Sequence, residues 1–102
     1  MTSKERAYLK GLAMNIDPIL QIGKASVTPE NIESVRGAID ARELIKITVL
    51  KNCLNEPRDI AEVLAERTRS HVVQVIGRKI VLYKESKEHK KIYLPGQKQP
   101  KK

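Results

Sequence analysis

The segment Gly23-Lys24-Ala25-Ser26 places small residues and one cation immediately before a predicted helix start. Small residues let backbone N–H groups approach an anion, and a helix N-terminus adds unpaired N–H donors and the positive end of its dipole. Lys24 adds a full positive charge at the same place. Local sequence leaves two interpretations open, a phosphate-binding loop or a simple strand-to-helix turn in which Gly23 supplies a permissive backbone.

A second group of cations, Arg78 and Lys79, follows Gly77 at the turn of a predicted hairpin. Charged turn tips are common, so local sequence slightly favours a solvated turn over a phosphate contact. Further candidates for contact with an anion are Lys10, Lys46 and Lys51, and the direction of their side chains depends on packing.

Catalytic and metal-binding chemistry is not indicated by this chain. Most carboxylates lie on predicted helices beside Lys or Arg, where solvated helix faces explain them. No Gly-x-Ser-x-Gly elbow, phosphate loop ending in Gly-Lys-Ser/Thr or zinc signature is present. Cys53 is the only cysteine, and His71 and His89 lie far from it in sequence. We therefore expect no enzymatic activity, no metal ion, no cofactor and no disulfide.

The charge balance favours a polyanionic partner. Lys and Arg outnumber Asp and Glu by 20 to 12, which gives a formal net charge of +8, and cations that neutralise phosphates release condensed counterions. We favour nucleic acid over simple solubility as the reason for this surplus. No apolar run approaches the roughly 20 residues of a membrane helix, and the N-terminal stretch lacks the apolar region of a signal peptide. We expect a cytoplasmic protein without a membrane partner.

The spacing of apolar and turn residues positions these candidates in one domain, because 102 residues allow one modest core. The predicted helices cover 3–14, 29–41 and 57–68, and the predicted strands cover 19–22, 43–51 and the two arms of a hairpin at 71–84 that turns at Gly77-Arg78. The predicted fold is α/β (α+β), a single two-layer domain in the order α-β-α-β-α-β-β with a four-stranded mixed sheet packed against helices. We expect the domain to cover 1–95 and a basic, disordered tail to cover 96–102.

Several blocks of sequence together resemble a known family over about residues 3–95. The blocks are LKGLA at 9–13, QIGK at 21–24, ARELIKITVLKN at 41–52, IAEVLAERT at 60–68 and VVQVIGRKIVLYK at 72–84. In order, spacing and length the chain resembles a stand-alone bacterial CRM domain, the YhbY-type RNA-binding protein of ribosome maturation. The resemblance implies a fold related to the C-terminal domain of bacterial translation initiation factor three. It also implies RNA as the ligand and an association with precursors of the large ribosomal subunit.

The resemblance bears on the individual candidate residues as well. The family's RNA-contacting loop has the pattern Gly-x-x-Gly, as in KH domains. Carried over, Gly23 is its first glycine, Lys24 and Ala25 are its middle positions, and Ser26 replaces its last glycine. Serine is costly there if the position needs a positive φ, although its hydroxyl can itself donate to phosphate. A basic or polar residue follows the hairpin glycine in many members, which favours Arg78.

The leading hypothesis is a non-enzymatic RNA-binding protein that assists assembly of the large ribosomal subunit. The chain has three tyrosines and no Phe or Trp, so we expect recognition of phosphate, 2′-hydroxyl and shape more than of base sequence. The alternative is a protein-interaction adaptor whose basic surface meets an acidic partner. The tail has three interpretations: a source of added charge, a segment ordered on ribosomal RNA, or a solubilising end. A monomer is the simpler expectation.

Overall fold

The structure is a computed structural model that describes residues 1–88 and 90–95. Within these residues seven elements follow one another: α1 (Ser3–Ala13), β1 (Leu20–Ile22), α2 (Pro29–Arg42), β2 (Leu44–Val49), α3 (Pro57–Thr68), β3 (His71–Ile76) and β4 (Lys79–Tyr83). The predicted order α-β-α-β-α-β-β is confirmed. The expectation of a disordered tail at 96–102 lies outside the described residues, and the domain limit at residue 95 stays a prediction.

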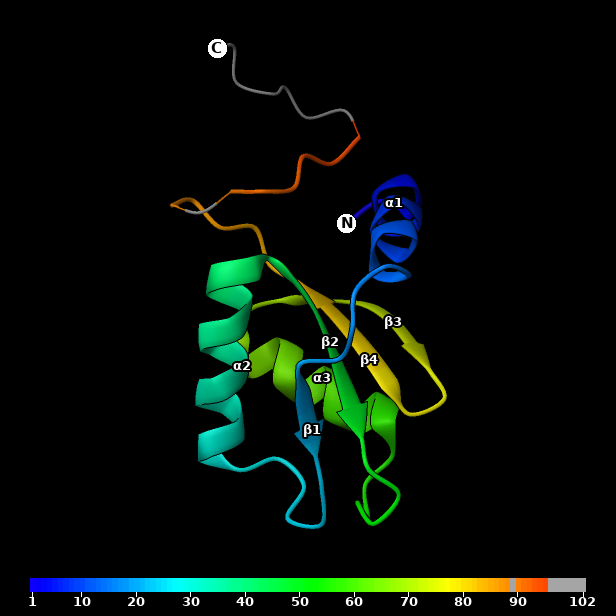
Figure 1. The fold of residues 1–102 in the computed structure, drawn as a ribbon, viewed down its shortest axis with the longest axis vertical. Helices are drawn as coiled ribbons and strands as arrows, with labels where there is room; N and C mark the ends of the chain where they lie inside the picture. The colour runs from blue at the N-terminus through cyan, green and yellow to red at the C-terminus, as the bar shows by residue number, and fades with distance from the viewer. Residues whose placement is uncertain (89, 96–102) are drawn as a thin grey trace.

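The four strands form one mixed sheet in the order β1-β2-β4-β3. β1 pairs in parallel with β2, and the chain between them passes through α2, since a parallel pair needs a crossover. β4 pairs antiparallel with both β2 and β3. Figure 1 shows α2 beside the sheet, α3 behind it and α1 near the opposite end from the β1–α2 loop.

Local chemistry explains where the elements begin and turn. The Thr28 hydroxyl accepts a hydrogen bond from the Asn31 N–H at 3.1 Å, and Pro29 occupies the first turn of α2, as predicted. Between β3 and β4, Gly77 has a φ of 55°. A glycine with positive φ at the first central position is typical of a type II′ hairpin turn, so the predicted tight hairpin is confirmed.

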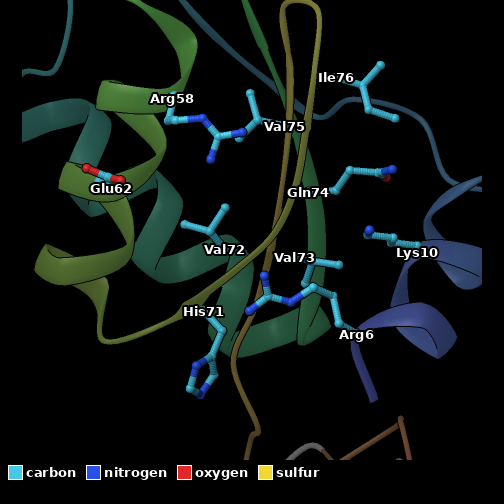
Figure 2. A pocket seen from close by; sticks show the side chains of 10 residues that line it. All are labelled: Arg6, Lys10, Arg58, Glu62, His71, Val72, Val73, Gln74, Val75 and Ile76. Atoms are coloured by element: carbon cyan, nitrogen blue, oxygen red, sulfur yellow. The ribbon is translucent and has the colours of Figure 1, made fainter. Parts of the chain in front are cut away.

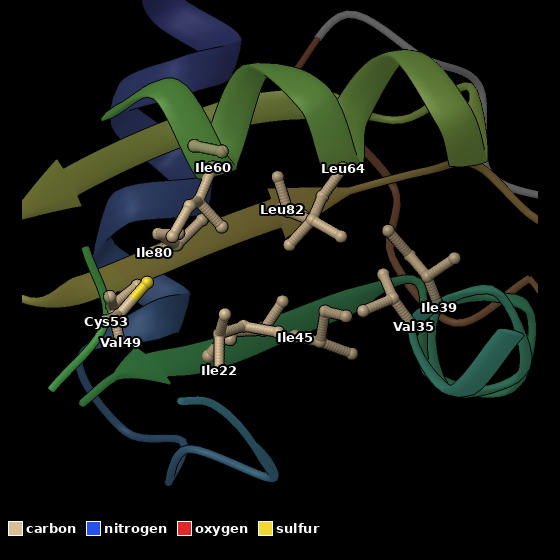
Figure 3. Packing of buried hydrophobic residues seen from close by; sticks show 12 residues of the cluster. Ile22, Val35, Ile39, Ile45, Val49, Cys53, Ile60, Leu64, Ile80 and Leu82 are labelled. Carbon is tan, nitrogen blue, oxygen red and sulfur yellow. The ribbon is translucent and has the colours of Figure 1, made fainter. Parts of the chain in front are cut away.

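The larger part of the core lies between the sheet and the two helices α2 and α3. Alternate residues of β2, among them Ile45, Ile47 and Val49, point into this cluster, and Ile60 and Leu64 of α3 pack against them. Figure 3 shows α3 lying across the strands, with the aliphatic side chains of this cluster between the helix and the sheet. The core is aliphatic, as the composition predicts.

The opposite face of the sheet is covered by α1 and by the chain that follows β4. Leu9 and Ala13 of α1 join Leu44, Val81 and other buried residues in a second cluster, which Leu94 completes. The described chain therefore adds a partial third layer to the two layers that the sequence predicts. Towards the hairpin this face carries the half-buried side chains of Lys46 and Thr48. A basic part of the sheet is thus left without a covering helix.

Tyr83 closes the second cluster with a buried hydroxyl that has no hydrogen-bond partner in the described part of the chain. Burial, followed by the negative charges of Glu43 and Glu85, raises the pKa of Tyr83 to about 12. In the unfolded chain the pKa of a tyrosine is about 10. The neutral hydroxyl therefore favours the folded state fully below pH 10, and this contribution is lost as pH rises from about 10 through about 12.

We expect Tyr83→Phe to leave stability at pH 7 unchanged or to raise it by up to about 1 kcal/mol, because the substitution removes an unpaired buried polar group. The gap between variant and wild type should widen between about pH 10 and 12 in urea unfolding curves recorded at several pH values. A variant that loses more than about 1 kcal/mol at pH 7 would show that the hydroxyl makes a stabilising contact.

Candidate nucleic-acid interface

Three connections meet at one end of the sheet. β1 and β2 run in parallel and both end there, and the β3–β4 hairpin turns there. The loops 23–28 and 50–56 lead from this end into α2 and α3, as Figure 1 shows at its lower edge. Three groups of predicted contact residues therefore come to the same end: Gly23, Lys24, Ala25 and Ser26; Lys51; and Arg78 with Lys79.

The loop 23–28 is held by hydrogen bonds on both sides. The Ser26 N–H donates to the Gly23 carbonyl at 2.9 Å and closes a turn. The Asn31 side-chain amide donates to the Ser26 carbonyl at 2.9 Å, which ties the turn to α2. On the strand side, the Leu50 N–H donates to the Ile22 carbonyl at 2.8 Å. The turn therefore has a fixed position relative to the helix N-terminus.

Lys24 and Ala25 form the exposed tip of this turn. In the part of the chain that the structure describes, their backbone N–H groups donate to no acceptor. The Lys24 side chain likewise makes no ion pair among these residues. Two free N–H donors and one cation near the start of a helix are groups that can bind an anion.

Ser26 has a φ of 57°, so the position that the resemblance matches to a glycine has a left-handed backbone in this chain. A residue with a Cβ costs about 1 kcal/mol in this region. Gly23 behaves differently, because a Cβ added there would lie 3.5 Å from Leu50 Cδ1, an ordinary contact. The left-handed backbone of the turn is therefore at Ser26. At position 23 the space around the backbone would also accept a residue with a side chain.

The guanidinium group of Arg78 points back into the fold. Its Nε donates to the Val49 carbonyl at 2.8 Å and its Nη2 donates to the Leu50 carbonyl at 2.6 Å. Leu50 in turn donates to the Ile22 carbonyl, one residue before the turn. Arg78 therefore fixes the end of β2 and, through it, the base of the loop 23–28. The RNA contact predicted for Arg78 stays a prediction, and the geometry gives it a positioning role.

Arg78→Ala separates these two roles. We expect a loss of about 1.5–3 kcal/mol in the free energy of unfolding, because two carbonyls lose charge-assisted hydrogen bonds. The slope of log K against log salt for single-stranded RNA should change little. Lys79→Ala is the matched control, because the exposed Lys79 side chain has no partner among the described residues. The free energy of unfolding should therefore be unchanged. The steepness of the salt dependence should decrease by about 0.7, the contribution of one phosphate contact. A similar decrease in the steepness of the salt dependence for Arg78→Ala would instead indicate that Arg78 contacts phosphate directly.

The uncovered face of the sheet brings Lys46 and Lys79 together. They line a hollow of about 180 Å³ with Gln74, Ile76 and Val81. The strand register explains this arrangement, since Lys46 pairs with Val81 across β2 and β4 and Ile76 pairs with Lys79 across β3 and β4. Both lysines therefore lie on the same face, towards the hairpin.

Lys10 lies in a larger groove of about 450 Å³ along the outer edge of β3. Figure 2 shows Arg6 and Lys10 of α1 on one side of this strand and Arg58 and Glu62 of α3 on the other. Gln74 and Ile76 line both this groove and the hollow at Lys46 and Lys79, so the two depressions adjoin.

Sequence reasoning missed Arg6 and Arg58. Arg6 precedes Lys10 by four residues, and that spacing places both side chains on one face of a helix. The signal was therefore present for Arg6. Arg58 reaches the groove only because α3 packs beside β3, which a local pattern does not reveal.

Other chemistries find no support in the described residues. No three His, Cys, Asp or Glu side chains at 1–88 and 90–95 lie close enough together to hold a metal ion. Cys53 is buried as a free thiol. No helix in the same ranges is long and apolar enough to span a membrane.

The four-stranded mixed sheet, its three helices and the cation-bearing turn before α2 define a small α/β domain. The profile of the CRS1 / YhbY (CRM) domain family matches residues 1–84, and the chain belongs to this family. The Bacillus subtilis protein named "Probable RNA-binding protein YqeI" is 47% identical over 95 residues, covering 93% of this chain and 99% of that protein. A Haemophilus influenzae protein named "RNA-binding protein" is 32% identical over 95 residues, covering 93% and 95%.

A solved structure supports the same fold. The solution structure of SAV1595 from Staphylococcus aureus, whose description proposes RNA binding, superimposes with a TM-score of 0.80 at 49% sequence identity. The match covers 93% of this chain and 99% of that protein. The predicted fold class and the predicted family are therefore confirmed.

Proposed function

We propose that the protein is a non-enzymatic, cytoplasmic RNA-binding protein that holds the RNA backbone on the loop 23–28 and the basic surface around it. The observation that carries the proposal is the exposed tip of this loop, where Lys24 and Ala25 offer two free N–H groups and a cation. The net charge of +8 and membership of a family whose relatives are named as RNA-binding proteins support it. Lys51, Lys79, Lys46 and Lys10 would extend the contact along the RNA.

We further propose ribosomal RNA in a precursor of the large subunit as the ligand, with the protein acting as a monomeric assembly factor. This step rests on the resemblance to the stand-alone bacterial CRM domain. Backbone contacts that ignore base identity suit a folded ribosomal RNA, where the shape of the RNA selects the site.

Sucrose-gradient fractionation of cell lysate, with and without ribonuclease, tests the proposed partner. We expect the protein to sediment with large-subunit precursors and to move to the top of the gradient after ribonuclease treatment. The gradient is repeated at low salt, because contacts to phosphate weaken steeply as salt rises. Sedimentation only at the top under both conditions would remove the ribosomal partner from the proposal.

A second candidate function, an adaptor for an acidic protein, is favoured by the groove along β3. β3 is an edge strand of the sheet, and edge strands offer backbone groups to an added strand. Arg6, Lys10 and Arg58 flank it with positive charge. Capture of partners from lysate before and after ribonuclease treatment distinguishes the two functions, since a protein contact survives the loss of RNA.

A further inference from the structure

A hollow of about 290 Å³ lies between the loop 23–28 and the start of α3. It is lined by Ser26, Val27, Asn55, Asp59, Ile60 and Val63. Ser26 belongs to both the hollow and the turn that carries Lys24 and Ala25. The hydrogen bond from Asn31 to the Ser26 carbonyl fixes this shared wall. The hollow therefore adjoins the turn that carries Lys24 and Ala25.

The floor of the hollow is aliphatic. Ile60 is buried in the core, Val27 is half-buried, and Val63 keeps 41% of its surface exposed. Ile60 and Val63 are three residues apart and share one face of α3. An exposed valine that continues a buried face offers an apolar surface next to a polar loop.

The rim of the hollow is formed by polar side chains that make no hydrogen bond or ion pair within the described residues. These are the exposed side chains of Asn55 and Asp59. Asn55 lies outside α3, because the N-cap is Glu56. The carboxylate of Asp59 accepts hydrogen bonds only, whereas the Asn55 amide both donates and accepts.

Charge decides which part of a nucleotide suits this place. The negative charge of Asp59 repels phosphate, whereas Lys24 attracts it on the other side of Ser26. A nucleobase has apolar faces and a polar edge, which matches an aliphatic floor with a polar rim. The turn at Lys24 therefore suits the phosphate of a nucleotide, and the neighbouring hollow suits its base.

We propose that this hollow is a subsite for one unpaired nucleobase of the RNA whose backbone lies on the loop 23–28, an inference that rests on the proposed function. The base packs on Val63 and Val27, and Asp59 accepts from its edge. Cytosine, adenine and guanine carry an exocyclic amino group that can donate to a carboxylate, whereas uracil presents two carbonyl oxygens beside a single N–H. The subsite therefore prefers amino-bearing bases to uracil. It supplies base readout without an aromatic side chain.

The test compares the full chain on three labelled oligonucleotides of the same length and charge: oligocytidine, oligouridine and an abasic ribose-phosphate chain. We expect oligocytidine to bind about three- to tenfold more tightly than the abasic chain. Oligouridine should fall between them. Val63→Ala should remove most of the advantage of oligocytidine and leave abasic binding unchanged. Met14→Ala, another exposed apolar residue, lies at the end of α1 and serves as the control for a changed surface.

The outcomes separate the subsite from the proposed function. If wild-type protein binds none of the three chains, RNA binding itself fails. If it binds all three equally, the subsite is overturned and backbone binding stands. A single 2-aminopurine in a cytidine chain gives a readout that needs no variant, because its fluorescence changes when the base enters an apolar site. Unchanged fluorescence on binding would also overturn the subsite.

Discussion

Reversing the charge at Lys24 is expected to weaken binding of single-stranded RNA by about tenfold or more, which corresponds to about 1.4 kcal/mol. The substitution Lys24→Glu removes the proposed phosphate contact and places a negative charge beside the free N–H groups of the turn. The side chain is exposed and has no internal partner in the described chain, so folding should be unaffected. Fluorescence anisotropy at fixed ionic strength measures the affinity, and circular dichroism monitors the fold.

Lys87→Glu is the matched control for this experiment. It changes the net charge by the same amount, and Lys87 is exposed beyond the end of β4, away from the hairpin end of the sheet. An effect of net charge alone would be similar for both variants, whereas a site at the turn makes Lys24→Glu much the weaker binder. Equal affinities for wild type and Lys24→Glu, with intact secondary structure, would remove the loop from the proposed function.

The elements that the sequence predicted well are those whose signals are local. Thr28 and Pro29 mark the start of α2 because both act within one turn of the chain. Gly77 marks the hairpin because a two-residue turn between antiparallel strands favours a positive φ, which glycine adopts without strain. Along β2 the side chains of Ile45 and Ile47 lie on one face of the sheet and that of Lys46 on the other, because successive residues of a strand point to opposite faces.

The features that the sequence could not reveal depend on distant partners. The positioning role of Arg78 is one such feature, because its guanidinium binds carbonyl groups that lie 29 and 28 residues earlier in the chain, and its contact with RNA stays a prediction. The α1 helix covers the second face of the sheet because Leu9 and Ala13 meet Val81 and Leu94, contacts between opposite ends of the chain. The contact residues at Lys24, Lys51 and Lys79 lie at one end of the sheet, and their contact with RNA stays a prediction.

Glu43 is the clearest case of a residue whose role appears only in the folded chain. It stands in the sequence as an ordinary charged residue before a strand, yet its side chain is fully buried and its φ is 66°. Its carboxylate accepts hydrogen bonds from the N–H groups of Ser86 at 2.7 Å, of Ile92 at 2.8 Å and of Lys91. Its own carbonyl accepts from the Lys84 N–H at 2.9 Å. Through these bonds Glu43 holds the chain that follows β4 onto the fold, alongside the apolar contacts of Ile92 and Leu94.

Glu43→Ala is expected to lower the free energy of unfolding by about 2–4 kcal/mol. Three backbone N–H groups lose a charged acceptor, each such bond contributing about 1.5–3 kcal/mol, and release of the segment to water recovers part of the loss. Urea unfolding measures the change. Limited proteolysis should cut first among residues 86–91, and hydrogen exchange there should accelerate before the rest of the sheet opens.

Two further substitutions at the same position identify the cause of the loss. Glu43→Gln keeps one acceptor oxygen but turns an N–H₂ group towards a backbone donor, so an intermediate loss is expected. Glu43→Gly removes the carboxylate and relieves the positive φ, so it should lose less than Glu43→Ala if strain matters. Wild-type stability and wild-type protection of residues 86–92 in Glu43→Ala would mean that the segment is held by Ile92 and Leu94 instead. Loss in all three variants, largest for alanine, assigns the docking to the carboxylate, because the apolar contacts of the segment are the same in each.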